Sequence, residues 1–278
     1  MSCPLLASTP PAVLGFGLLD PTGRIDIPAD SVTAAAFATH ALSVPCATAV
    51  TDSAGLQGLE RANPDFIDEQ ARYLLEDMPI AALKVGMLSC PETAGVIAGV
   101  AADYSEAPLV LQLGPQENLN TSDEDEYEGV DGEPCVGAIL ELLVPQATIA
   151  VLPATAMARW LNDDVLRNYK PSDGASALLT LGASWALVTG HEQRPGSRVN
   201  LLLGPEGQTI ALPCQPTPAR VQELSSLTAM AIACNLAHGR DLIDAVKSAL
   251  TYAGQAAQAA FQAGMGHKLA NRMPMTTS

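Results

Sequence analysis

The stretch Ala81-Ala82-Leu83-Lys84-Val85-Gly86-Met87-Leu88 is a short, mostly apolar run typical of a strand, and it decides the fold class. A helical segment, Pro91 to Ala102, follows it, and then a second apolar run, Pro108 to Leu113. A strand, a helix and a strand in this order form a unit whose two strands are parallel. Strands that are apolar throughout are typical of a sheet covered by helices on both faces. The stretch therefore predicts an α/β fold with a mostly parallel sheet.

The same alternation continues toward both ends of the chain, so the predicted sheet has more than these two strands. The further strands are predicted over Ala12 to Leu19, Val44 to Val50, Ala147 to Leu152 and Ser184 to Thr189. The further helices are predicted over Ser31 to Leu42, Pro64 to Met78 and Val136 to Val144.

The last third of the chain departs from the βα pattern. Arg198 to Leu203, the turn Gly204-Pro205-Glu206-Gly207 and Gln208 to Leu212 predict a hairpin, and hence an antiparallel edge of the sheet. Two long helices follow, each with a glycine expected as its C-cap: one ends at His238 and the other spans Asp241 to Ala263.

Composition excludes several classes of partner. The 278 residues are 48% hydrophobic and carry 14 Lys and Arg against 30 Asp and Glu, a formal net charge of −16. Such a charge gives no general attraction to nucleic acid or to anionic lipid. No apolar run reaches the roughly 18 to 20 residues of a membrane span, and the stretch Met1 to Leu19 has no basic region typical of a signal peptide. We expect a soluble cytoplasmic protein that binds neither nucleic acid nor membranes.

Residues that bind metals are scattered along the chain. The six cysteines form no CxxC pair and the four histidines lie far from one another. We therefore predict no metal site and expect reduced, mostly buried thiols. One segment, 116–134, holds eight Asp or Glu residues and no basic residue. A mobile surface loop is the simpler interpretation of this segment, and a cation site is the alternative.

Several motifs together point to one family. Asp20-Pro21-Thr22-Gly23 followed by Ile27-Pro28-Ala29-Asp30 resembles the segment D-P-S-G-G-A-G-[IL]-Q-A-D of hydroxymethylpyrimidine/phosphomethylpyrimidine kinases. Lys84-Val85-Gly86-Met87-Leu88 is similar to their K-[IL]-G-M-L, and Val188-Thr189-Gly190-His191 to their [VI]-[KT]-G-G-H. Residues 245–252 and 264–266 resemble the C-terminal helix and tail, so the match covers nearly the whole chain. The resemblance implies a single ribokinase-like domain over 1–278, a three-layer αβα sandwich with a mostly parallel sheet and an antiparallel edge hairpin.

The resemblance also implies a reaction. These kinases of thiamine biosynthesis transfer a phosphoryl group from ATP, with Mg²⁺, to the hydroxymethyl group of a small aminopyrimidine and then to the phosphate of that product. The family commonly dimerises, so a homodimer is implied. The residues implied to bind substrate are Gly17, Asp30, Ser53 and Met87, and Thr189 and Gly190 are implied to bind the nucleotide. From the sequence alone, Asp30 is equally well explained as the N-cap of the helix that follows it.

The start of the first long C-terminal helix departs from the family pattern. The family has G-[ST]-G-C there, whereas this chain has Glu223-Leu224-Ser225-Ser226. Ser226 takes the position of the catalytic base, but an unassisted hydroxyl is a poor base and no His or Asp is near it in sequence. Since Thr217-Pro218 is a good N-cap and N1 pair, we predict that the helix begins near Pro218 and absorbs the anion-binding loop.

Other family positions differ as well. The Glu223 carboxylate would lie near the γ-phosphate, and two like charges about 4 Å apart repel by about 4 kcal/mol at an effective dielectric constant near 20. The metal carboxylates of the motifs V-x-D-P-V and T-P-N-x-x-E are absent from 109–113 and 151–156, and Arg24-Ile25-Asp26 replaces G-A-G. Two hypotheses stay open: a working kinase with rearranged catalytic groups, and a non-catalytic member, or pseudokinase, that binds a small pyrimidine-like ligand or a protein partner. The chemistry of the residues favours the second, and a purely structural subunit is a third possibility.

Overall fold

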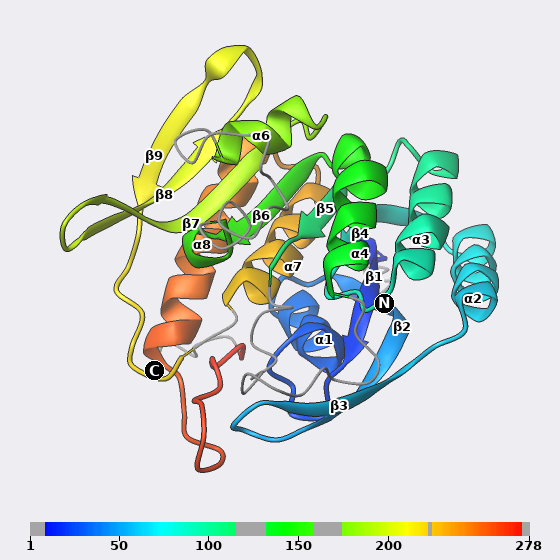
Figure 1. The fold of residues 1–278 in the computed structure, drawn as a ribbon, viewed down its shortest axis with the longest axis horizontal. Coiled ribbons are helices and arrows are strands. Elements are labelled where there is room, and N and C mark those ends of the chain that lie inside the picture. Colours follow the sequence, from blue (N-terminus) through cyan, green and yellow to red (C-terminus); the bar gives the residue numbers. More distant parts are fainter. Residues whose placement is uncertain (1–8, 115–131, 158–173, 222–223, 274–278) are drawn as a thin grey trace, which may run out of the picture.

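The computed structural model describes residues 9–114, 132–157, 174–221 and 224–273 (Figure 1). Its centre is a nine-stranded sheet with the order β3-β2-β1-β4-β5-β6-β7-β8-β9. In this spatial order, the strands β2, β1, β4, β5, β6 and β7 are all parallel. At the two edges the pairing is antiparallel: β3 pairs with β2, β8 pairs with β7, and β9 pairs with β8. The strands are β1 Ala12–Leu19, β2 His40–Thr51, β3 Leu56–Arg61, β4 Ile80–Val85, β5 Leu109–Gln112, β6 Ile149–Pro153, β7 Ala186–Arg194, β8 Ser197–Leu203 and β9 Thr209–Pro213. The mostly parallel sheet with an antiparallel edge hairpin is confirmed.

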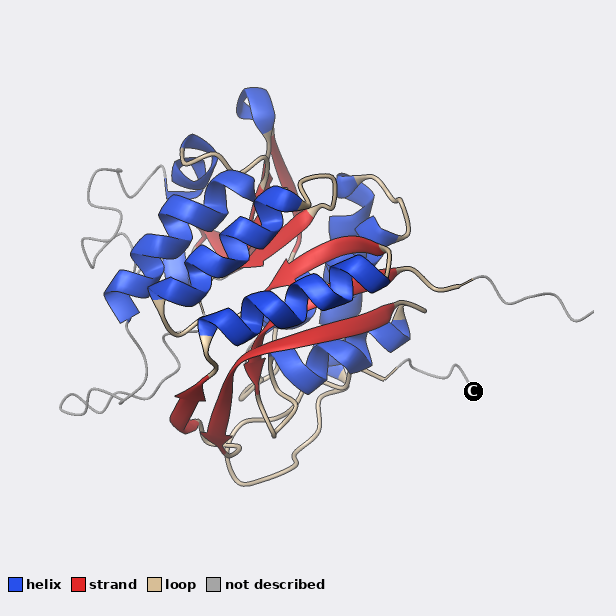
Figure 2. Cartoon of the chain, turned by 90° about the vertical axis from the view of Figure 1, so that its right-hand side faces the viewer, coloured by secondary structure: helices blue, strands red, loops and turns tan. Residues whose placement is uncertain are grey.

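Helices cover both faces of the sheet and complete three layers (Figure 2). On one face, α2, α3, α4 and α6 bury their apolar sides in one core, and α1, α7 and α8 form a second core on the other face. The α-helices are α1 Asp26–Ala36, α2 Pro64–Asp77, α3 Pro91–Asp103, α4 Gly132–Ala138, α6 Gly174–Thr180, α7 Leu224–Ala237 and α8 Leu242–Gln258. This is the predicted αβα sandwich.

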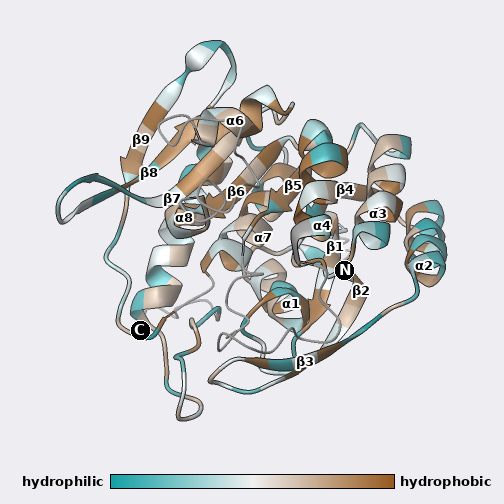
Figure 3. Cartoon of the chain, viewed as in Figure 1, coloured by the Kyte–Doolittle hydropathy of each residue, from teal (hydrophilic) through white to brown (hydrophobic). Residues whose placement is uncertain are grey.

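The hydropathy of each element follows its place in the layers (Figure 3). Central strands such as β6 are apolar on both faces because helices cover both. The rim helix α2 is mostly hydrophilic and buries only Ile67 and Ala71 fully. Its start is encoded locally, since the Asn63 side chain accepts a hydrogen bond from Asp65 N and Pro64 follows as the first helical residue. No helix in the described ranges is long and apolar enough to cross a membrane.

The helix predicted over 31–42 is shifted. Helix α1 begins at Asp26 and ends at Ala36, and residues 40–42 belong to β2. Ala38, with φ of 50°, turns the chain out of the helix. Asp30 therefore lies inside α1, and the interpretation of Asp30 as an N-cap is wrong.

The helix predicted to begin near Pro218 is also wrong. Val221 N bonds Pro218 O in a turn, Arg220 has a φ of 67°, and α7 begins at Leu224. The C-terminal tail causes the difference: Lys268 N donates to Arg220 O at 2.8 Å and Lys268 pairs with Val221 in a β-bridge. Glu223 and most of the acidic segment 116–134 lie outside the described residues.

The C-terminal glycines differ in their roles. Gly239, with φ of 73°, follows α7 as predicted and donates its N–H to Leu236 O. Helix α8, by contrast, ends at Gln258 rather than Ala263, so Gly264 is not its C-cap. Residues 259–273 form a tail that packs back on the domain.

Candidate functional site

The site begins with two glycines at the carboxyl ends of neighbouring strands. Phe16 of β1 pairs with Val85 of β4, so Gly17 and Gly86 lie side by side. A Cβ atom at Gly17 would lie 2.6 Å from Asp26 Oδ2, and one at Gly86 would lie 2.2 Å from Asp26 Oδ1. The two glycines therefore leave the space that the Asp26 carboxylate occupies.

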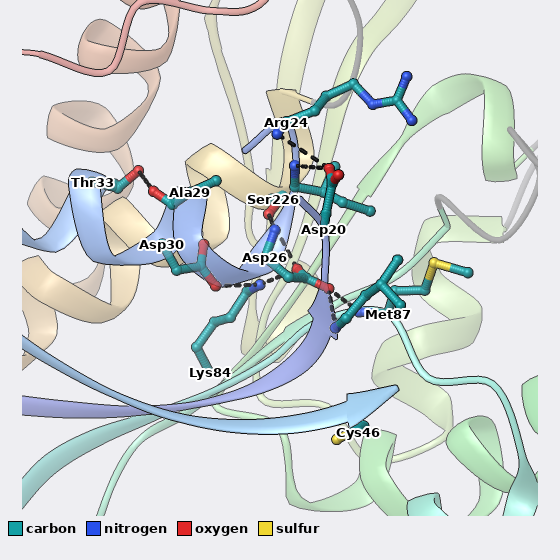
Figure 4. A network of polar contacts seen from close by, with 12 residues as sticks. Asp20, Arg24, Asp26, Ala29, Asp30, Thr33, Cys46, Lys84, Met87 and Ser226 are labelled. Carbon is teal, nitrogen blue, oxygen red and sulfur yellow. Dashed lines mark hydrogen bonds and ion pairs between the residues drawn. The ribbon is translucent and has the colours of Figure 1, made fainter. Parts of the chain in front are cut away.

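Asp26 joins three parts of the chain (Figure 4). Its Oδ2 accepts hydrogen bonds from the backbone N–H groups of Leu18, at 3.1 Å, and Met87, at 2.9 Å. Its Oδ1 accepts from Lys84 Nζ and from Ser226 Oγ, the latter at 3.2 Å. The residue is fully buried and has a φ of 39°, a backbone conformation that is strained for a residue with a side chain. A strained, buried residue held by so many partners is typical of a functional site.

Lys84 links Asp26 to a second carboxylate. Its Nζ also donates to Asp30 Oδ2 at 2.8 Å, and Lys84 is fully buried. Burial alone would lower the pKa of Lys84, but the two carboxylates outweigh it and the pKa is raised. Burial raises the pKa of Asp30 to about 6, although the Lys84 ammonium acts in the opposite direction. We call Asp26, Asp30, Lys84 and Ser226 the polar cluster.

Arg272 of the tail and Asp20 hold the loop around the polar cluster. Arg272 donates to Thr33 Oγ1 at 3.0 Å and to the Arg24 carbonyl oxygen. Burial lowers the pKa of Arg272, against the effect of Asp30 and other nearby groups. The Asp20 carboxylate accepts hydrogen bonds from backbone N–H groups of residues 22, 24 and 25, which fixes the loop between β1 and α1.

Ser226 has a carboxylate partner, Asp26, that is distant in the sequence. Its Oγ donates to Asp26 Oδ1 and accepts from Asp26 N at 3.0 Å. The carboxylate comes from 200 residues away in the sequence, so a search near Ser226 could not find it. The available signal was an Asp at position 26, where the related segment has a glycine.

A cavity of 810 Å³ lies on the other side of the first turn of α7. Leu224 and Ser225 of this turn line it, together with Thr189 and Gly190, the two residues predicted to bind the nucleotide. Gly190, with φ of 71°, donates its N–H to Asn200 Oδ1 at 3.0 Å. Ser225 thus borders the cavity, while the next residue, Ser226, belongs to the polar cluster.

The four residues predicted to bind substrate divide into two groups. The first group lies at the polar cluster: Gly17 and the Met87 backbone contact Asp26, and Asp30 bonds Lys84. The Met87 side chain is buried in a small core with Leu18, Ile25, Ala47, Ala49 and Leu56. Ser53 lies in the turn between β2 and β3 and is engaged by the tail: its Oγ accepts from Gly266 N and its carbonyl oxygen accepts from His267 N.

The described residues contain no group of three or more His, Cys, Asp or Glu side chains arranged to hold a metal ion. Among the described residues that line the cavity, Glu192 is the only carboxylate.

Known proteins resemble this chain in sequence and in fold. A hydroxymethylpyrimidine/phosphomethylpyrimidine kinase of Streptomyces coelicolor is 29% identical over 267 residues, which cover 96% of each chain. The crystal structure of a phosphomethylpyrimidine kinase from Clostridium difficile aligns with a TM-score of 0.68 and 23% identity, over 87% of this chain and 97% of that one. An ADP complex of Bacillus subtilis pyridoxal kinase aligns with a TM-score of 0.76 and 17% identity, over 95% and 98% of the two chains. These structures establish a ribokinase-like fold.

The family model described as phosphomethylpyrimidine kinase matches residues 20–271, a range that includes the polar cluster and the described lining of the cavity. Because this match covers most of the sequence, the chain belongs to the phosphomethylpyrimidine kinase family.

Proposed function

We propose that the chain is a kinase that transfers the γ-phosphoryl group of ATP to the hydroxymethyl group of a small aminopyrimidine, and then to the phosphate of that product. One observation carries the proposal: the first turn of α7 separates a cavity large enough for a nucleotide from a buried polar cluster. A phosphoryl donor and acceptor on opposite sides of one helix N-terminus meet where free backbone N–H groups can bind the transferring group.

The cavity is the proposed nucleotide site. Thr189 and Gly190 on one side, and Leu224 and Ser225 on the other, would contact the nucleotide and its terminal phosphates. Magnesium takes one or two carboxylates together with phosphate oxygens, and Glu192 could supply one. Substrate phosphate oxygens would complete the coordination, because the described lining offers no second carboxylate.

The acceptor is proposed to sit beside Gly17, Asp30 and Met87. Oδ1 of Asp30 is buried and has no hydrogen-bond partner among the described residues, so it can accept from a ring amine. With a pKa of about 6, Asp30 is mostly ionised at neutral pH and suits this role. The Met87 thioether can pack on the ring when the ligand enters.

The proposed base is the pair Ser226 and Asp26. The substrate hydroxyl gives its proton to Ser226 Oγ while Ser226 gives its own proton to Asp26 Oδ1. The proton therefore ends on the Asp26 carboxylate, and no negative charge is left on the Ser226 oxygen. Lys84 holds Asp26 in place beside Ser226. A carboxylate from the β1–α1 loop thus serves the hydroxyl on α7.

The test is release of ADP from ATP and Mg²⁺ in the presence of hydroxymethylpyrimidine. We expect turnover by the unmodified chain and a loss of about 100- to 10,000-fold in kcat for Ser226→Ala and Asp26→Asn. Ser226→Cys keeps a group able to exchange a proton at this position and is expected to retain more activity than Ser226→Ala. Background-level ADP release by the unmodified chain would sink the proposal and favour the non-catalytic alternative.

We also propose that the protein acts in the cytoplasm as a homodimer, an expectation that rests on the family resemblance. Light scattering of the purified chain tests the dimer, and a single species with the mass of the monomer at micromolar concentration would contradict it.

A further inference from the structure

Gln112, the last residue of β5, has an amide that the described part of the structure leaves unpaired. The residue is 3% exposed, and both Nε2 and Oε1 are buried without a hydrogen-bond partner among the described residues. Native proteins contain few such groups because an unmade buried hydrogen bond costs free energy. An amide kept at this cost indicates a partner other than the described residues, and a bound ligand is such a partner.

The strand pattern places Gln112 on the face of the sheet that α7 covers. Leu109 and Leu111 pack in the core of the α2 and α3 layer, whereas Val110 packs with α7. Successive residues of a strand point to opposite faces. Gln112 therefore shares the face of Val110, under α7.

On one side, Gln112 adjoins the polar cluster. Leu111 of β5 pairs with Val85 of β4, so the next position along both strands sets Gln112 beside Gly86. The Asp26 carboxylate lies directly over Gly86. The amide is thus one strand away from the carboxylate that bonds Ser226.

On the other side, Gln112 adjoins the cavity. It pairs with Val151 of β6, and two residues further along these strands Gly114 and Pro153 line the cavity. Leu224 of α7 lines the same cavity. Gln112 therefore lies below the path between the cavity and the polar cluster.

We propose that Gln112 Nε2 donates a hydrogen bond to the phosphoryl group during its transfer, an inference that rests on the proposed function. In this step the bond from phosphorus to the bridging oxygen of ATP breaks, and its electron pair stays on ADP. A bond forms between phosphorus and the substrate oxygen, whose proton goes to the Ser226 and Asp26 pair. A neutral donor in a buried position stabilises the phosphoryl oxygens without bringing a charge that repels Asp26.

The experiment compares Gln112→Leu with the unmodified chain. Leucine has a similar size but no polar atom, so removing the unpaired amide should leave the urea midpoint unchanged or raise it. The same change should lower kcat about 100- to 1,000-fold, as the loss of an oxyanion donor does, with a smaller change in the KM for ATP. A merely structural glutamine would give the opposite result, a lower urea midpoint with unchanged kcat.

Gln146→Leu is the matched control. Gln146 Nε2 donates to the carbonyl oxygens of Ala98 and Leu142, so this variant should lose stability and keep its kcat. Turnover by Gln112→Leu equal to that of the unmodified chain overturns the inference and leaves the proposed function standing. Absence of turnover in the unmodified chain overturns the proposed function, and the role of Gln112 with it.

Discussion

The two sides of the first turn of α7 differ in how their polar groups are used. In the polar cluster, Asp26 is fully buried and each of its oxygens accepts two hydrogen bonds. In the cavity on the other side, Thr189 and Gly190 border open space. The chain therefore fixes the position of its acid and hydroxyl groups in advance, and leaves open the volume in which a ligand must be exchanged.

The largest effect is expected where the polar cluster loses its cation. Lys84→Met leaves Asp26 and Asp30 buried without the ammonium that both carboxylates bind. Removing one partner of a buried ion pair lowers the free energy of unfolding by about 3–5 kcal/mol. Urea unfolding measures this loss. Lys247→Met is the control, because the pair of Lys247 with Asp244 is exposed and its loss should change the free energy of unfolding by less than about 0.5 kcal/mol. Equal losses in the two variants would show that the cluster is not held by its charges.

A second effect concerns pH. Asp30 has a pKa of about 6 in the folded chain against 3.8 ordinarily, so the folded state binds the proton more tightly than the unfolded state. Stability from this group is therefore greatest below about pH 4 and falls as the pH rises to about 6, by at most about 3 kcal/mol. Asp30→Asn should remove this part of the pH dependence. Parallel stability curves for the two proteins between pH 4 and 6 would refute the assignment to Asp30.

A third change tests the space that the cluster needs. Gly86→Ala puts a Cβ atom 2.2 Å from Asp26 Oδ1, so the carboxylate or the strand must move. We expect a loss of about 1–3 kcal/mol in the free energy of unfolding. Gly95→Ala is the matched control: nothing lies within 4 Å of its Cβ position in α3, and alanine should stabilise that helix by about 0.5–1 kcal/mol. A gain in stability for both variants would contradict the close packing of Asp26.

The smallest effect is expected in the cavity, on the affinity for ADP. Ala253 of α8 lines the cavity, and Ala253→Leu should fill part of it and weaken ADP binding about tenfold, or about 1.4 kcal/mol. Calorimetric titration measures this. Thr251→Leu, on the exposed side of α8, should bind ADP as the unmodified chain does. Unchanged affinity in Ala253→Leu would place the nucleotide elsewhere.

The sequence predicted the elements whose signals are local. Helix α2 was correct because Pro64 and an amphipathic pattern mark its start and course, and β1 was correct because an apolar run of eight residues is covered on both faces. The edge strand β3 was missed, since Leu56–Arg61 has mixed polarity and only one neighbour. Local propensity predicted a helix after Pro218, but pairing between Val221 and Lys268 prevents it.

By itself, then, the sequence determined the parallel α/β sheet, the antiparallel edge hairpin and the family, because periodicity and short motifs are properties of neighbouring residues. Only the tertiary structure decided what Asp26 does. A glycine at 17 and another at 86 make room for its carboxylate, and Ser226 reaches it across 200 residues. Hydrogen bonds depend on distance in space, and partners that lie 200 residues apart form no pattern among neighbouring residues that would show they meet.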